Sequence, residues 1–324
     1  MRLVDEATLR RHIGPAEALA AVERAFRAVA TGALTQPPPV GLDIPAREGE
    51  VHIKSAYLHG AAIFAVKVAT GFYANRADHL PTGSGLILVF DAGTGFPLAL
   101  LEDNGYLTDL RTAAAGALAA RLLAPSRISR VAMIGSGVQA RYQLRAISRV
   151  IHWESARAWS PHAEHCAAYC AEMSDELKRS CLPAKTAAAA VHDAELIVTT
   201  TPSRAPLFDG DAVRPDVTVI AVGSDGPEKR ELPADLLSRA GKIVVDDVAQ
   251  CLALGELHHA VAAGAVRAAD VHGTLGDVLA GVRPGREGRE LIVCDLTGLG
   301  AQDAAIAEAA WHGVRALAAD AGSE

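Results

Sequence analysis

The spacing of hydrophobic positions divides the chain into two parts with different periodicities. In the first part, Leu19, Val22 and Phe26 recur at helical spacing, which predicts a helix over residues 15–31. Apolar runs separated by short turns follow, and they predict strands in antiparallel pairs. These runs lie at residues 51–58, 61–70, 86–90 and 97–101. The first part is therefore expected to hold a helix and a mostly antiparallel sheet.

In the second part, short apolar runs alternate with helical stretches. An alanine-rich helix is predicted over residues 108–124, with Thr108 or Asp109 as its cap and Pro125 beyond its end. Buried strands are predicted at residues 131–134, 156–159, 195–199, 217–222, 242–245 and 291–294. This alternation predicts an α/β fold, with a doubly wound parallel sheet joined to a smaller first domain. A last helix, over residues 302–319, is expected to pack back on the first domain.

A glycine turn follows the first of these buried strands. The sequence Gly135-Ser136-Gly137 leads into a helix predicted from Val138, and the spacing is G-x-G-x-x-A with Ala140 in the last place. The first glycine permits the tight turn, and the second lets the backbone approach a pyrophosphate. The N–H groups at the start of the helix would hold the phosphates. Strand, turn and helix together predict a dinucleotide-binding site, whereas the glycines alone would indicate only a tight turn.

Composition narrows the classes of function. The 324 residues are enough for two domains, and the net charge of −7 without basic runs argues against nucleic-acid binding. The chain starts without a signal-peptide pattern and has no apolar run long enough to span a bilayer, so no membrane association is expected. Five cysteines without regular spacing indicate reduced thiols and a cytoplasmic protein.

Three cations stand at positions where a cation is unfavourable or unexpected. Lys67 interrupts an apolar strand, and a buried ammonium is costly unless it is paired, which favours a lysine in a pocket over one at a sheet edge. Lys54 shares a strand face with His52, and this pair alone would indicate a solvated face. Arg111 lies near a helix start, where the helix dipole disfavours a cation. It either pairs with Asp109 or another acid, or serves as a fork for a carboxylate.

Asp225 follows the strand predicted at residues 217–222, at the carboxyl end where ligands of such sheets bind. The alternative, an aspartate that caps its own turn, is equally consistent with the sequence. Many dinucleotide-binding sites have an acid about twenty residues after the glycine turn, and this acid binds the ribose hydroxyls. This chain has no acid there. Ser160 and Pro161 stand at that place, so NAD and NADP are both open as the cofactor.

The histidines and cysteines do not form a pattern typical of a metal site. His162, Cys166 and Cys170 are spaced four residues apart, but the chain has no paired C-x-x-C motif. We therefore expect no metal centre.

Seven segments, in this order, resemble the ornithine cyclodeaminase/mu-crystallin family over nearly the whole chain. They are Lys67-Val-Ala-Thr-Gly-Phe-Tyr73, Leu80-Pro-Thr-Gly-Ser-Gly85, Leu107-Thr-Asp-Leu-Arg-Thr-Ala-Ala114, Ile134-Gly-Ser-Gly-Val-Gln-Ala140, Thr199-Thr-Thr-Pro-Ser203, Val222-Gly-Ser-Asp225 with Lys229, and Asp295-Leu-Thr-Gly298. The resemblance implies a substrate-binding and dimerisation domain of residues 1–112 and 303–324, and a Rossmann domain of residues 113–302 that binds NAD or NADP. It also implies a homodimer.

The resemblance also implies roles for single residues. Lys67 and Arg111 would bind the substrate carboxylate, and Asp225 would exchange a proton with the substrate nitrogen; Lys67 and Asp225 form the expected catalytic pair. The expected cofactor-binding residues are Thr82, Arg111, Thr112, Gly135, Gly137, Val138, Gln139, Ser160, Thr200, Thr201, Ser224, Lys229 and Thr297.

One stretch departs from the family pattern. Many members carry another arginine for the carboxylate after a proline turn, where this chain has Gly41, while Lys54 stands where members are often apolar. The sequence Val-His-Ile-Lys-Ser at residues 51–55 resembles the branch with ectoine-utilisation protein C and iminosuccinate reductases. We therefore expect a small anionic imino or amino acid as the substrate, with Lys54 and His52 at a second carboxylate.

The expected activity is NAD(P)-dependent imine reduction or amino-acid dehydrogenation, with iminosuccinate to aspartate as the first choice. Two alternatives stay open on the sequence alone. One is a cyclodeaminase that releases ammonia from ornithine and uses NAD internally. The other is a non-catalytic protein that binds NADPH and a small ligand, as the resemblance to mu-crystallin suggests.

Overall fold

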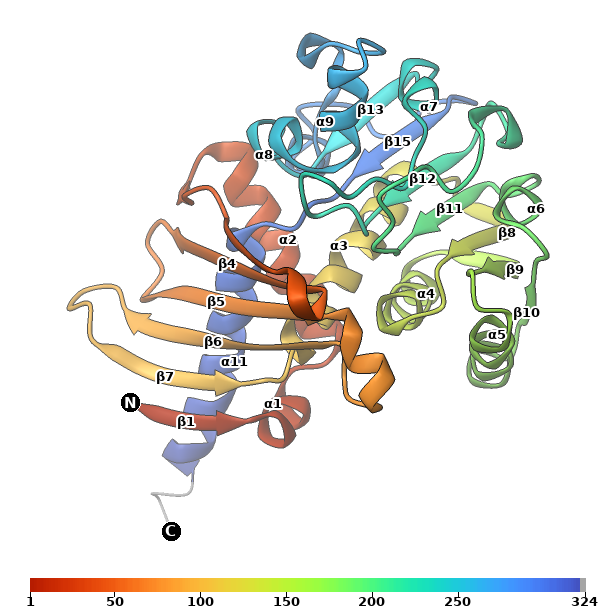
Figure 1. Cartoon of the computed structure of the whole chain (residues 1–324). Helices are drawn as coiled ribbons and strands as arrows, with labels where there is room; N and C mark the ends of the chain where they lie inside the picture. The colour runs from red at the N-terminus through yellow and green to blue at the C-terminus, as the bar shows by residue number, and fades with distance from the viewer. Residues whose placement is uncertain (321–324) are drawn as a thin grey trace. The chain divides into compact units, whose positions relative to one another are not determined.

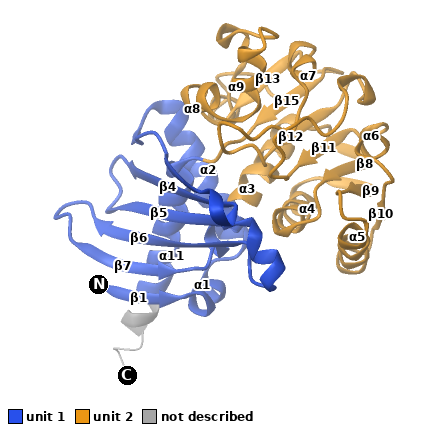
Figure 2. Cartoon of the chain, viewed as in Figure 1, with its two compact units in different colours: residues 1–111, 299–324 blue, residues 112–298 orange. Residues whose placement is uncertain are grey.

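A computed structural model describes the backbone of residues 1–320 and the side chains of residues 1–315. The chain forms two compact units, coloured separately in Figure 2. Unit 1 holds Met1–Arg111 and Leu299–Glu324, and unit 2 holds Thr112–Gly298. The bounds expected from the sequence, at residues 112 and 303, differ from these by one and four residues. Among the described helices, none is both long and apolar enough to cross a membrane.

Unit 1 contains a seven-stranded sheet in which nearly all neighbours are antiparallel. The order is β1 (Arg2–Asp5), β7 (Pro97–Glu102), β6 (Gly83–Asp91), β5 (Ile63–Phe72), β4 (Gly49–Leu58) and β2 (Leu34–Thr35), with β3 (Val40–Ile44) also paired to β4. Only β1 and β7 are parallel among these pairs. The four strands predicted from the sequence are present with shifted ends. The short edge strands β1, β2 and β3 were not predicted, because they carry too few apolar residues to form a pattern.

Helices cover one face of this sheet. Unit 1 contains α1 (Glu6–His12), α2 (Pro15–Thr31), α11 (Gly300–Asp320), and the 3-10 segments η1 (Pro45–Arg47) and η2 (Tyr73–Asp78). Helix α11 packs on α2 and runs across β4 and β5, as Figure 1 shows. The strand residues that face it alternate along each strand and are buried, for example Ala65, Ile87 and Leu101. The last helix therefore packs on the first unit, as the sequence predicted.

Unit 2 is built on an eight-stranded parallel sheet. Its order is β10 (Ser180–Pro183), β9 (His152–Trp159), β8 (Arg127–Ile134), β11 (Leu196–Thr199), β12 (Thr218–Ala221), β15 (Ile292–Asp295), β13 (Lys242–Val245) and β14 (Gly273–Thr274). From β8 the chain goes outward to β9 and β10, then returns to β11 on the other side. This reversal is the topological switch point at which doubly wound sheets bind ligands. The predicted fold class is confirmed.

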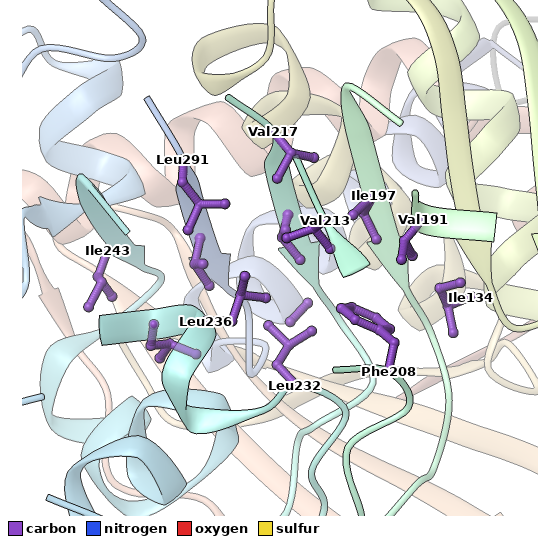
Figure 3. Packing of buried hydrophobic residues seen from close by; sticks show 14 of the residues in the cluster. Ile134, Val191, Ile197, Phe208, Val213, Val217, Leu232, Leu236, Ile243 and Leu291 are labelled. Atoms are coloured by element: carbon purple, nitrogen blue, oxygen red, sulfur yellow. The ribbon is translucent and has the colours of Figure 1, made fainter. Parts of the chain in front are cut away.

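Helices complete unit 2 and enclose its hydrophobic core. They are α4 (Val138–Val150), α5 (Ala163–Leu177), α6 (Ala187–Val191), α7 (Ala234–Ser238), α8 (Val248–Ala253), α9 (Gly255–Ala262) and α10 (Leu275–Leu279), with the 3-10 segments η3 (Gly210–Ala212) and η4 (Ala268–Asp270). On one face of the sheet, strand residues such as Ile197 and Ile243 pack with Val191 of α6 and Leu236 of α7 (Figure 3). This core fixes the strands whose carboxyl ends carry the candidate site residues.

The boundary between the units falls inside α3 (Tyr106–Leu123). The Asp103 carboxylate accepts a hydrogen bond from the Leu107 backbone N–H at 2.8 Å, so Asp103 caps the helix. The predicted caps, Thr108 and Asp109, lie inside the first turn, and that prediction is wrong. Arg111 consequently lies in the second turn rather than the first, where the helix dipole opposes a cation less strongly.

Candidate functional site

Unit 1 buries three cations. Lys54, Lys67 and Arg111 are only 4%, 2% and 5% exposed. Lys54 on β4 and Lys67 on β5 are direct cross-strand partners, so their side chains share the face covered by α11. Like charges directly opposite each other on a sheet are destabilising. A buried acid or an anionic ligand is therefore needed to balance this cluster.

Asp303 on α11 supplies that acid. Its Oδ2 lies 2.9 Å from the Lys67 Nζ, and its Oδ1 lies 2.9 Å from the Arg111 Nε, with the Asp303 side chain 2% exposed. The neighbouring Gln302 accepts a hydrogen bond from Arg111 Nη1 at 3.2 Å on its Oε1. Arg111 therefore pairs with an acid other than Asp109, and these bonds fix the plane of its guanidinium.

The charges of this cluster influence one another strongly. Burial and the charge of Arg111 together lower the pKa of Lys67 to about 7, although Asp303 partly offsets both effects. Although burial opposes ionisation of Asp303, the charges of Arg111 and Lys67 keep its pKa below the usual value. Burial raises the pKa of Asp103, the other acid that interacts with Lys67. Arg111, Lys67 and Lys54 all favour the charged form of Asp303, so the surroundings of this carboxylate are rich in positive charge.

His52 lies two residues from Lys54 on the same face of β4, half-buried beside an acid. Its Nε2 is 3.7 Å from Glu50 Oε2, and Glu50 also accepts a hydrogen bond from the Tyr73 hydroxyl at 2.7 Å. The sequence prediction considered His52 without Glu50. His52 and Glu50 therefore form a polar pair on the strand that carries Lys54.

In unit 2, the glycine turn lies at the switch point of the sheet. Gly135 has a φ of +123°, and a Cβ there would lie 2.4 Å from Thr200 Oγ1, so only glycine fits. Gly137 precedes α4 without a side-chain cap, and a Cβ there would meet no atom within 4 Å. The N–H groups at the start of α4 thus have room for an anion. Ser136 Oγ donates to Ser160 Oγ at 2.8 Å, which brings the end of β9 to this turn.

Asp225 lies on the loop after β12. Lys229 Nζ donates a hydrogen bond to Asp225 Oδ1 at 2.7 Å, and the Ser224 hydroxyl donates to the Lys229 carbonyl. The Asp225 side chain is 36% exposed, whereas that of Lys229 is 10% exposed. The loop therefore presents one accessible carboxylate beside an ammonium, which is an arrangement suited to proton exchange with a ligand.

The expected cofactor-binding residues divide between the units. Thr82 and Arg111 belong to unit 1, and the others belong to unit 2. Of the latter, a subset lies on loops after β8, β9, β11 and β12: Gly135, Gly137, Ser160, Thr200, Thr201, Ser224 and Lys229. Val138 and Gln139 open α4, and Thr112 accepts a hydrogen bond from Gln143 on its carbonyl at 3.0 Å. Thr297 is buried and donates to Asp246 Oδ1 at 2.9 Å, so it has a structural partner.

Several polar or charged residues of these sites were not identified from the sequence. Gln302 and Asp303 lie far from Lys67 along the chain, and Glu231 and Glu256 follow the Asp225 loop without a recognised motif. Asp303 did carry a signal, because an acid in an alanine-rich helix that packs on a sheet needs a cationic partner. The buried Glu231 carried none, because its partners are backbone N–H groups and threonine hydroxyls that lie at least eight residues away along the chain.

Comparison with known proteins gives one family and several solved relatives. The sequence model of the ornithine cyclodeaminase/mu-crystallin family matches residues 2–316. The structure of Thermococcus litoralis Δ1-pyrroline-2-carboxylate reductase in complex with NADH and L-proline is 29% identical, with a TM-score of 0.93 over 98% of both chains. An archaeal alanine dehydrogenase dimer with bound NAD is 33% identical, with a TM-score of 0.90 over 98% of this chain and 96% of that one.

A third solved relative is the iminosuccinate reductase of Paracoccus denitrificans in complex with NAD+. It is 32% identical, with a TM-score of 0.88 over 98% of this chain and 97% of that one. The three relatives are similar to this chain over both units rather than over one domain. Their names differ in substrate but agree in a nicotinamide cofactor.

Proposed function

Because the chain belongs to the ornithine cyclodeaminase/mu-crystallin family, we propose that it is a nicotinamide-dependent oxidoreductase acting on small α-imino or α-amino acids. The observation that carries the proposal is the cluster of three buried cations, two of which, Lys67 and Arg111, bond the same buried acid, Asp303. Solved relatives named as reductases or dehydrogenases, each with NADH or NAD, support the same class of reaction.

In the proposed site, Lys67 and Arg111 bind the α-carboxylate of the substrate. The guanidinium is oriented by Asp303 and Gln302, so its remaining N–H donors are held in a fixed direction. Such orientation lowers the entropy that is lost when the reacting carbon is placed for hydride transfer. Asp225 delivers the proton to the nitrogen during reduction and removes it during oxidation.

The cofactor is a nicotinamide dinucleotide, and the residues of unit 2 fit it. Gly135 and Gly137 provide the tight turn and the open approach, and the start of α4 provides N–H groups for the pyrophosphate. When bound, the cofactor supplies or accepts the hydride. Ser160, in place of an acid, is compatible with the ribose of NAD and with the 2′-phosphate of NADP.

The substrate we favour has two carboxylates. Lys54 adds a third cation to the pair that would bind the α-carboxylate, and it lies directly opposite Lys67. A distal carboxylate would pair with Lys54, with His52 nearby, whereas the distal ammonium of ornithine would be repelled. The proposed reaction is iminosuccinate plus reduced cofactor plus a proton giving aspartate plus oxidised cofactor. A cyclodeaminase acting on ornithine fits the cluster less well for this reason.

We further propose a homodimer formed through the open face of the sheet in unit 1. The strand residues on the face away from α11 include Leu3, Val40, Leu42 and Ile53, which are 64%, 59%, 58% and 36% exposed. Several exposed apolar side chains on one face of a sheet favour an interface over a solvated surface. The relative described as an alanine dehydrogenase dimer supports the assignment.

The activity test mixes the protein with oxaloacetate, ammonia and NADH or NADPH, and follows the absorbance of the reduced nicotinamide. Pyruvate with ammonia and a cyclic imino acid serve as comparison substrates. We expect cofactor oxidation that is fastest with oxaloacetate and depends on ammonia. Oxidation with pyruvate or the cyclic imine alone would overturn the dicarboxylate assignment, and no oxidation with any substrate would overturn the proposed reaction class.

A further inference from the structure

A fully buried acid in unit 2, Glu231, has no role in the proposed reaction. Glu231 is 0% exposed and stands six residues after Asp225 along the chain. Burying a carboxylate is costly unless hydrogen bonds replace its water. The positions of its partners indicate what this residue does.

Four hydrogen bonds converge on the Glu231 carboxylate from two loops. Oε1 accepts from the Thr201 backbone N–H at 2.6 Å and from the Thr201 hydroxyl at 2.7 Å. Oε2 accepts from the Gly223 backbone N–H at 2.8 Å and from the Thr199 hydroxyl at 2.7 Å. Thr199 and Thr201 lie at the end of β11, and Gly223 lies at the end of β12. One side chain therefore ties together the loops after two neighbouring strands.

The two loops approach each other unusually closely at this point. A Cβ on Gly223 would lie 2.2 Å from the Thr201 carbonyl oxygen and 2.6 Å from Glu231 Oε2, so only glycine fits. A second acid binds the backbone at Glu231. Glu256 accepts hydrogen bonds from the backbone N–H groups of Glu231 and Leu232 at 2.8 and 2.9 Å. Hydrogen bonds therefore fix both the carboxylate of Glu231 and the backbone that carries it.

Both loops belong to the proposed site. The loop after β11 carries Thr200, whose hydroxyl donates a hydrogen bond at 3.4 Å to the carbonyl of Ile134, the residue before Gly135, and the loop after β12 carries Asp225. We propose that Glu231 is a positioning residue that fixes the Asp225 loop relative to the cofactor-binding segment Thr200-Thr201. This inference rests on the proposed function, and it assigns to Glu231 no contact with substrate or cofactor.

The test is the Glu231→Gln variant, which keeps the size of the side chain. A carboxylate accepts on both oxygens, but an amide has one oxygen and one NH2 group. One carboxylate oxygen accepts from the Thr201 backbone N–H, and the other accepts from the Gly223 backbone N–H. The amide of the variant must turn its NH2 group toward one of these donors, and the hydrogen bond to that loop is lost. We expect kcat to fall about 10- to 100-fold, as for a misplaced catalytic group, with little change in KM for the imino acid, because its carboxylate is bound by residues of unit 1.

Ile243→Val is the matched control, because it loosens the core of unit 2 on β13 without touching either loop. It is expected to leave kcat unchanged. If the Gln variant does not fold, Thr199→Val removes one of the four donors with nearly the same shape, and a smaller fall of kcat is expected. A folded Gln variant with unchanged kcat, or an equal loss in the Ile243 control, would overturn the assignment.

The outcome for the wild-type protein separates this inference from the proposed function. If the wild type shows no turnover with any imino acid, the proposed function fails. The Kd for NADH, measured by nicotinamide fluorescence, then still tests whether Glu231 positions the segment Thr200-Thr201. Glu231→Gln is expected to weaken NADH binding through Thr200 and Thr201, and an unchanged Kd would overturn the inference on its own.

Discussion

Removing the charge of Asp303 perturbs the cation cluster at its centre. Asp303→Asn keeps the shape of the side chain but removes the only carboxylate within 4.0 Å of Lys67 Nζ and Arg111 Nε among the described residues. Both contacts are 2.9 Å long, and all three side chains are at most 6% exposed. Breaking a buried ion pair by removing one partner costs about 3–5 kcal/mol, because the other charge stays buried without compensation.

The loss is expected to depend on pH, and its sign follows from Lys67. In the wild type the folded pKa of Lys67 is about 7, below the ordinary value of 10.5, so the folded state binds fewer protons than the unfolded state between these values. Stability therefore rises with pH across this window. Without Asp303 the folded pKa falls further, and the folded variant stays deprotonated below pH 7, where the wild type gains a proton. The difference in stability between wild type and variant is consequently larger at pH 6 than at pH 9.

Urea unfolding at pH 6 and at pH 9 measures both effects. Asp193→Asn is the control, because Asp193 forms an exposed pair with Arg130 at 2.8 Å and such pairs contribute only about 0–1 kcal/mol. The reasoning is refuted if Asp303→Asn lowers the free energy of unfolding no more than this control does. It is also refuted if the loss is the same at both pH values, because the cluster then lacks the proposed charges.

The remaining predictions concern binding, catalysis and assembly. Lys54→Met should raise KM about 10- to 100-fold for the imine of oxaloacetate and leave KM for the imine of pyruvate unchanged; equal effects on both would remove the distal carboxylate site. Asp225→Asn should lower kcat about 10²- to 10⁴-fold without weakening NADH binding, as a titration of nicotinamide fluorescence would report. Leu42→Asp should shift a dimer toward the monomer in sedimentation velocity at constant helix content by circular dichroism. A dimer of unchanged stability would place the interface elsewhere.

The sequence predicted the parts of the site that depend on local patterns. Lys67 was recognised because a cation in an apolar strand needs a partner, and the glycine turn was recognised because strand, turn and helix follow one another. The helix cap was misplaced, because Asp103 stands before the stretch that has helical spacing. Sequence patterns of this kind depend on residues within a single strand, turn or helix, and they do not indicate contacts between distant elements.

The rest of the site depends on contacts between elements that are distant in sequence. The pairing of Lys54 with Lys67 depends on the register of β4 and β5, which the hydrophobic pattern alone did not determine. Asp303 meets these lysines only because α11 returns across the sheet of unit 1. Glu231 accepts hydrogen bonds from backbone N–H groups and threonine hydroxyls at the ends of two strands, and the sequence pattern does not show that these groups meet.

The central claim is that hydride passes between the nicotinamide and the Cα of an imino acid whose carboxylate the buried cations hold. The most direct test supplies oxaloacetate, ammonia and reduced nicotinamide cofactor that carries deuterium at the transferable position, and analyses the product by mass spectrometry and NMR. We expect the wild type to form aspartate with deuterium at Cα, and Lys67→Met to form much less of it. Deuterated malate in place of aspartate, or aspartate without deuterium, would contradict it.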